Sequence, residues 1–180
     1  MSVHDDPHAV DLELPIAARI AAASKRHGED VIVERAVSLI EGNNEGKEFL
    51  LIVGGEHAQG ILDGAPVLYW PELWGTRALL HAWNDNAADA VRSALSNQAW
   101  RVREMATRVV ATRRVDAREQ LLKLLEDETP RVRAGAARAL GTVGIAEDIE
   151  LISPLVKDAE IEVRRGAQVG MDAIRKRTTS

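Results

Sequence analysis

Four side chains that could act as acids or bases lie between positions 57 and 81: His57, Asp63, Glu72 and His81. Imidazole and carboxyl groups can exchange protons at useful pH values, so a cluster of them could supply a general acid and a general base. Such a site also needs a shared pocket and a fixed mutual geometry, which these positions do not specify. The sequence therefore predicts no catalytic residue.

Two other chemical signals also fall short of a site. The glycines of residues 54–60 (GGEHAQG) suggest a phosphate-binding loop, but no Lys-Ser or Lys-Thr pair follows Gly60 and no clear strand precedes it. The five histidines lack metal-ligand spacing, apart from His4 and His8, and the chain has no cysteine for thiolate chemistry or zinc binding. We expect no metal and no cofactor.

Tryptophan is concentrated in one stretch of a chain that has only six aromatic residues. Large aromatic side chains mostly bury their area, so we interpret the cluster as core beneath an irregular segment. An exposed recognition surface is the alternative. The cluster consists of Trp70, Trp74, Trp83 and Trp100.

Composition and charge indicate a globular chain without a membrane segment. Apolar residues make up 46% and charged residues 28% of the 180 residues. Residues 1–100 hold 7 basic and 15 acidic residues (net -8), and residues 101–180 hold 16 and 13 (net +3). This asymmetry could favour a charged partner or head-to-tail contacts, although a solvated surface is the simpler interpretation. No secretory signal or transmembrane run is visible, so we expect a cytoplasmic protein.

A repeat dominates residues 100–177. The string Arg101-Val102-Arg103 returns 30 residues later as Arg131-Val132-Arg133, and 31 residues after that as Glu162-Val163-Arg164. A small residue follows each Val by four places, and a larger apolar residue follows four places further on. A period of this length is typical of stacked supersecondary units, none of which buries its apolar face alone.

The segment 127–141 (DETPRVRAGAARALG) resembles a HEAT repeat of the short, phycobilisome-lyase-like group. The resemblance covers about Trp70 to Arg177 and is most specific from Trp100 onward. It implies an all-α fold, an α-solenoid in which antiparallel helix pairs form a right-handed superhelix. It does not imply lyase activity. Pro154 departs from the pattern and should kink its helix near Glu150.

Acidic and basic residues recur at constant places in the repeat. Asp127 precedes Arg133 by six residues, as Asp158 precedes Arg164, whereas Asn97 precedes Arg103. Partly buried charges at repeated positions are usually paired. We therefore expect a structural ladder in which each carboxylate meets the guanidinium of its own or an adjacent repeat. A ligand-binding row of arginines is the alternative.

Helical periodicity and breakers divide the chain into three parts. Residues 1–14 are predicted to form a flexible tail and residues 15–69 an N-terminal helical cap. Residues 70–177 are predicted to form HEAT-like repeats in one continuous domain. We expect helices at residues 16–27, 31–41, 45–53, 70–83, 87–96, 100–112, 116–126, 131–140, 147–157 and 161–176. Gly141 and Gly144 should bracket a turn, and residues 54–71 are the least regular part.

The second helix of each repeat should present its outer residues to a partner. Register matching gives columns of mixed charge, which suit a protein better than a nucleic acid. We therefore predict a non-enzymatic scaffold that binds another protein through a curved helical face. The alternative is a DNA-binding or DNA-glycosylase-type repair protein of the HEAT-like kind, in which Trp70, Trp83 and Asp85 would engage a base. The predicted face consists of Asp89, Ser93, Ser96, Glu119, Lys123, Glu126, Glu150 and Lys157, with Pro154 in the same columns.

Overall fold

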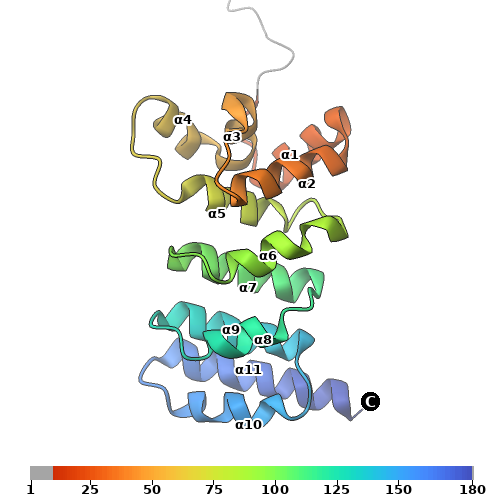
Figure 1. The fold of residues 1–180 in the computed structure, drawn as a ribbon, viewed down its shortest axis with the longest axis vertical. Coiled ribbons are helices and arrows are strands. Elements are labelled where there is room, and N and C mark those ends of the chain that lie inside the picture. The colour runs from red at the N-terminus through yellow and green to blue at the C-terminus, as the bar shows by residue number, and fades with distance from the viewer. Residues whose placement is uncertain (1–9, 180) are drawn as a thin grey trace, which may run out of the picture. The chain divides into compact units, whose positions relative to one another are not determined.

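The computed structural model describes residues 10–179, and within this range all regular structure is helical (Figure 1). The predicted all-α class is confirmed. The chain divides into two compact units at the boundary between Asn84 and Asp85. Of the predicted tail, residues 1–9 lie outside the described residues. None of the helices in residues 10–179 combines the length and apolar character needed to cross a membrane.

The first unit contains five helices that pack around Phe49, Ile20, Ile32 and Leu39, all of which are essentially inaccessible to solvent. Helices α1 and α2 separate at Gly28, whose φ of 93° is a conformation that glycine adopts without steric cost. The helices are α1 (Ile16–His27), α2 (Glu29–Ile40), α3 (Gly46–Gly54), α4 (Glu56–Leu62) and α5 (Trp70–Ala78).

Two arginines occupy the C-terminal end of α3. Arg19 donates from Nε to the carbonyl of Ile52 at 2.8 Å, and Arg77 donates from Nη2 to the carbonyl of Val53 at 2.9 Å. Helix C-terminal carbonyls lack intrahelical donors and carry partial negative charge, so guanidinium groups stabilise this end. Arg19 also donates to the carbonyl of Leu14, and its burial lowers the pKa of its guanidinium. The residues just before α1 are thus held against the first unit.

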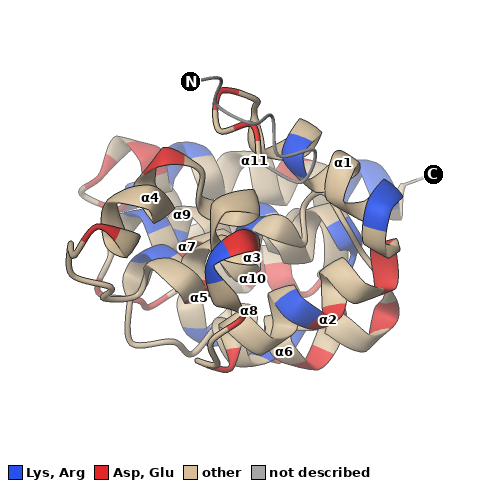
Figure 2. Cartoon of the chain, turned by 90° about the horizontal axis from the view of Figure 1, so that it is seen from above, with Lys and Arg blue, Asp and Glu red and all other residues tan. Residues whose placement is uncertain are grey.

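The second unit is built from three helix pairs. The pairs are α6 (Ala88–Ala94) with α7 (Trp100–Arg113), α8 (Arg118–Leu124) with α9 (Pro130–Val143), and α10 (Asp148–Ile152) with α11 (Ile161–Thr178). Short 3-10 segments, η1 (Asp85–Ala87) and η2 (Ser153–Lys157), precede α6 and follow α10. Helices α7, α9 and α11 form one layer, the A layer, and α6, α8 and α10 form the other, the B layer (Figure 2).

Val102, Val132 and Val163 occupy the same position in successive A-layer helices. Each is the third residue of its helix and is fully buried. Each also donates its backbone N–H to the carbonyl three residues earlier, at 3.0, 3.0 and 3.1 Å. The repeat in the sequence is therefore a repeat in the structure.

Glycine brings α9 and α11 unusually close. A Cβ added at Gly170 would lie 2.1 Å from the carbonyl oxygen of Ala137, and one added at Gly166 would lie 2.8 Å from that of Ala134. Gly141 was predicted to begin a turn, but it lies inside α9, where it faces Gly170. The prediction was wrong because this glycine serves helix packing, while Gly144 alone follows the helix.

Four predicted helices are shorter than expected, and two of them, 87–96 and 116–126, lose only residues at their ends. The helix that begins at Trp70 ends at Ala78 instead of extending to Trp83, because the next residues form tighter i to i+3 hydrogen bonds, such as Leu79 to Thr76. Around Pro154 the predicted helix 147–157 changes from α-helix over Asp148–Ile152 to 3-10 structure over Ser153–Lys157, and the kink near Glu150 stays a prediction. Proline leaves the carbonyl of Glu150 without its helical donor, and the hydroxyl of Ser153 donates to that carbonyl at 3.0 Å.

Candidate interaction surface

Each A-layer helix begins with the same side-chain turn. The Oδ1 atoms of Asn97, Asp127 and Asp158 accept hydrogen bonds from the backbone N–H two residues ahead, at 2.8, 2.8 and 2.9 Å. Asn and Asp favour this turn because their short side chains reach the local backbone. It directs the chain from the B-layer helix into the A-layer helix of the same pair.

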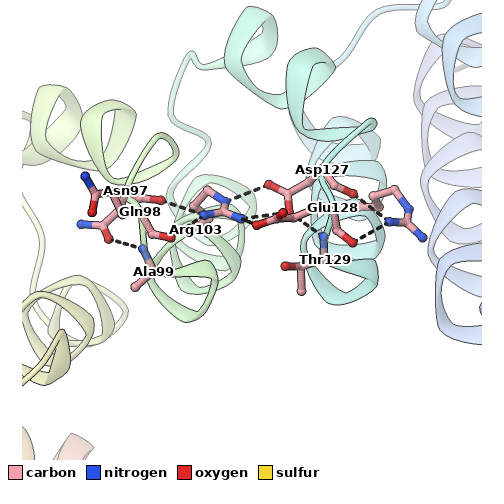
Figure 3. Close-up of polar contacts among 8 residues, drawn as sticks. Asn97, Gln98, Ala99, Arg103, Asp127, Glu128 and Thr129 are labelled. Carbon is pink, nitrogen blue, oxygen red and sulfur yellow. Dashed lines mark hydrogen bonds and ion pairs between the residues drawn. The ribbon is translucent and has the colours of Figure 1, made fainter.

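The Arg six residues after each of these turns holds the turn in place. Nη1 of Arg103 donates to the carbonyls of Asn97 and Gln98, both at 2.9 Å (Figure 3). Arg133 donates in the same way to the carbonyls of Asp127 and Glu128, as Arg164 does to those of Asp158 and Ala159. In each repeat one guanidinium thus donates hydrogen bonds to two backbone carbonyls of the turn, which have no donor within a helix.

The same guanidinium also reaches the next repeat. Arg103 donates from Nε and Nη2 to the two carboxylate oxygens of Asp127, at 2.8 and 3.0 Å (Figure 3). Arg133 donates from Nε and Nη2 to Asp158, at 2.9 and 3.1 Å. The side chain of Arg103 is 11% exposed and that of Asp127 is 7% exposed, so little water competes for these bonds. We call these two bidentate pairs the Arg–Asp rungs.

The rung between Arg133 and Asp158 changes the pKa of its carboxyl group. The hydrogen bond from Arg133 is the main cause of a lowered pKa at Asp158, and the backbone N–H of Glu160 acts in the same direction. Hydrogen bonds that favour the charged form of a carboxyl lower its pKa. The hydrogen bond from Arg133 therefore favours the charged form of the Asp158 carboxylate within the rung.

Asn97, the exception in the repeat, has a simple explanation in the sequence. In the sequence register, Gly75 stands where Arg103 and Arg133 stand in the later repeats, and position 97 carries an uncharged Asn in place of Asp. Asn keeps the turn-forming oxygen without placing an uncompensated charge in a partly buried site.

The B layer presents the predicted interaction face. All eight of its residues are exposed: Asp89, Ser93, Ser96, Glu119, Lys123, Glu126, Glu150 and Lys157. Their charges are mixed, as Figure 2 shows for the chain as a whole. Asp89 pairs with Arg92 within α6, and Arg92 also donates to the carbonyl of Asp116 at 3.0 Å. The face therefore consists of exposed side chains on a fixed backbone.

Sequence reasoning missed the pair beneath this face. Asp148 is completely buried at the start of α10, where it accepts from Nε of Arg118 at 2.9 Å and from the backbone N–H of Ile145 at 2.8 Å. The hydrogen bond that Arg118 donates to Asp148 is the main cause of a raised pKa at Arg118. The two residues lie 30 positions apart, one repeat length, and this spacing could have revealed them.

Comparison with known proteins agrees with this geometry. Residues 88–171 match the family model described as HEAT repeats. These residues carry HEAT repeats. The crystal structure of an engineered protein from the Northeast Structural Genomics Consortium is similar, with a TM-score of 0.54 and 22% identity over 92% of this chain and 86% of that one. The predicted α-solenoid is confirmed, and no curated protein matches the sequence. The phycobilisome-lyase-like subgroup stays a prediction.

The four predicted tryptophans are divided between the two units, three in the first and Trp100 in the second. Trp74 is buried in the first unit and stacks on half-buried Trp70, with ring centroids 6.0 Å apart. Trp83, also half-buried, donates its backbone N–H to Glu29 in the same unit. Trp100 belongs to the second unit, where it begins α7.

The four residues considered for acid–base chemistry are placed differently. His57 lies beside Trp70, with ring centroids 6.2 Å apart, while Asp63 accepts from the side chain of Gln59 one turn earlier. Glu72 is half-buried in α5, and His81 is exposed after that helix ends. Within residues 10–179, no three His, Asp or Glu side chains gather closely enough to hold a metal ion.

Proposed function

We propose that the HEAT repeats form a non-enzymatic scaffold that binds another protein through the exposed face of the B layer. The observation that carries this proposal is the pair of Arg–Asp rungs, which join the first repeat to the second and the second to the third. Buried bidentate ion pairs with further hydrogen bonds have defined geometry. They fix the spacing between successive B-layer helices, and so the pattern of charges that a partner meets.

A preorganised face binds more tightly than a mobile one of the same composition, because less conformational entropy is lost on association. The mixed charges on α6, α8 and α10 provide specificity for a complementary protein rather than general attraction to a polyanion. In this proposal the A layer and the rungs hold the face, and the B-layer side chains select the partner.

The test is quantitative affinity capture from the source cell with three proteins. One is the wild-type chain and one carries Glu119→Lys, Lys123→Glu and Glu150→Lys in the B layer. The control carries Glu34→Lys, Lys25→Glu and Glu41→Lys, which make the same charge changes at exposed positions of α1, α2 and the end of α2. We expect at least one protein to be captured by the wild type and the control, and to be reduced about tenfold with the B-layer variant. Identical capture by all three would refute the proposed face.

A further inference from the structure

A second surface, on the A layer, carries a regular set of arginines. Arg101 and Arg108 lie on α7, and Arg131 and Arg138 lie at the equivalent positions of α9, 30 residues later. All four are exposed. Seven residues of helix span about 10.5 Å, and neighbouring helices pack about 8–10 Å apart. The four residues therefore form a grid with sides of roughly 10 Å, which we call the arginine grid.

One side of the grid borders a groove. Arg108 and Arg138 line a hollow of about 340 Å³ between α7 and α9, with Thr107 and Gly135 among its other lining residues. A Cβ at Gly135 would lie 2.4 Å from Oγ1 of Thr107, so only glycine allows this approach of the two helices. The hydroxyl of Thr107 is itself bonded to the carbonyl of Glu104 at 2.7 Å. Small residues between two arginines leave room for an extended chain.

The two arginines beside the groove are available to a ligand. The side chains of Arg108 and Arg138 make no hydrogen bond or ion pair with any residue in the described range 10–179. Arg103 and Arg133, on the same two helices, use their guanidinium groups fully in the rungs. The repeat therefore separates arginines that hold the structure from arginines that face solvent.

The other side of the grid is ordered by an aromatic ring. The guanidinium carbon of Arg101 lies 4.4 Å from the ring centroid of Trp100, and that of Arg131 lies 5.8 Å from it. These distances are those of cation–π contacts, which restrict the conformations of both arginines. Trp100 thus joins the two helices at this end of the grid.

The arginine grid is confined to two repeats. In α11 the corresponding positions hold Glu162 and Val169 in place of the two arginines. Within the grid, Glu104 is the one acidic residue that shares the outer face of α7, at i+3 from Arg101 and i-4 from Arg108. The surface is a local basic site of four arginines and not a continuous basic stripe.

We propose that the arginine grid binds an extended acidic segment of a partner protein. Arginine matches carboxylates through bidentate hydrogen bonds. Three residues of a polyproline II chain make one turn, advance about 9 Å, close to the side of the grid, and return the side chain to the same side. A polypeptide with an acidic residue at every third position would place its carboxylates on successive arginines. Duplex DNA carries one charge per ~1.7 Å of its axis, far denser than the grid, so only a small share of its phosphates could meet the four arginines.

The test measures binding by fluorescence anisotropy at low salt, with the full chain and three labelled probes. The first probe is a peptide with Glu at every third position separated by Ser and Gly. The second has the same composition with its Glu residues contiguous, and the third is a short DNA duplex. Two variants of equal charge change are compared: Arg108→Glu with Arg138→Glu in the A layer, and Lys123→Glu with Lys157→Glu in the B layer. A milder pair, Arg108→Gln with Arg138→Gln, checks the result without introducing negative charge.

We expect the spaced peptide to bind more tightly than the contiguous peptide or the duplex, with an affinity that falls as salt rises. The A-layer Glu variant should weaken this binding at least about tenfold and the Gln variant less, while the B-layer variant changes it by about twofold or less. Tighter binding of DNA would overturn the proposal in favour of a nucleic acid. Equal losses in the A-layer and B-layer variants, or no binding of the spaced peptide, would also overturn it. The outcome does not depend on the proposed role of the B-layer face, because the B-layer variant serves here only as the charge-matched control.

Discussion

Arg103 donates two hydrogen bonds to the carboxylate of Asp127, which lies in the turn before α9 of the following repeat, while its third nitrogen donates to the carbonyl of Asn97 in the turn before α7 of its own repeat. One side chain therefore joins two repeats and closes a turn. Such a role depends on the planar fork of guanidinium, because an ammonium group cannot direct hydrogen bonds to a carboxylate and two carbonyls at once.

Replacing this fork while keeping its charge should destabilise the second unit. We expect Arg103→Lys to lower the free energy of unfolding by about 1–2 kcal/mol, since charge-assisted hydrogen bonds to a partly buried carboxylate are lost. Urea denaturation measures the effect. The control is Arg108→Lys on the same helix, which should change the free energy by less than about 0.5 kcal/mol. Equal effects at the two positions would mean that the contacts of Arg103 do not stabilise the fold.

The stability of the second unit should depend on the ionisation of Asp158. Its pKa is lower in the folded than in the unfolded chain, so the rung stabilises the fold above the unfolded value of about 3.9. That contribution is lost as the pH falls through the lower, folded pKa. We expect the difference in unfolding free energy between the wild type and Asp158→Asn to be constant from about pH 7 to pH 5, and to shrink below about pH 4. A difference that is unchanged at acid pH would contradict this assignment.

The close contact of α9 and α11 makes a sharp prediction about glycine. Gly170→Ala places a Cβ against the carbonyl of Ala137, so the helices must separate, at a cost of about 1–3 kcal/mol. Gly60→Ala is the matched control, because Gly60 lies within α4 with nothing within 4 Å of an added Cβ. There alanine should stabilise the helix by about 1 kcal/mol. Thermal unfolding of the two variants should therefore shift in opposite directions, and a stabilising Gly170→Ala would refute the packing argument.

The buried carboxylate of Asp148 should matter more than the exposed one of Asp89. Asp148→Asn removes the charge that Arg118 faces and leaves an amide where two donors, Nε of Arg118 and the N–H of Ile145, require acceptors. We expect the midpoint of thermal unfolding to fall by several degrees. Asp89→Asn, on the exposed face of α6, should leave it unchanged within error. Differential scanning calorimetry distinguishes the two, and equal midpoints would show that Asp148 is not a structural carboxylate.

Much of the fold could be predicted from the sequence because the same pattern of apolar, small and charged residues occurs three times. The spacing from Val102 to Val132 to Val163 defines the register of the A layer, and glycines such as Gly28 and Gly42 mark helix ends. Local signals could not show which glycines pack helices together. Gly141 has the sequence context of a helix end, and only the partner helix α11 explains its position.

The Arg–Asp spacing illustrates the same limit at the candidate site. A constant interval of six residues indicates a relationship between Asp127 and Arg133 but leaves open whether the contact lies within one repeat. In the structure Arg133 contacts the backbone carbonyl of Asp127 and the side chain of Asp158. One guanidinium contacts two repeats because of the way the helices stack. The six-residue spacing in the sequence does not specify that stacking.

If the Arg–Asp rungs hold successive HEAT repeats in register, Arg133 and Asp158 must be energetically coupled, and a double-mutant cycle measures that coupling. The free energy of unfolding is measured for the wild type, Arg133→Ala, Asp158→Ala and the double variant. We predict a coupling energy of at least about 1 kcal/mol, because each single substitution leaves its partner without a counter-charge in a partly buried site. Single effects that add to within about 0.3 kcal/mol would show that the two side chains act independently, and would contradict the account.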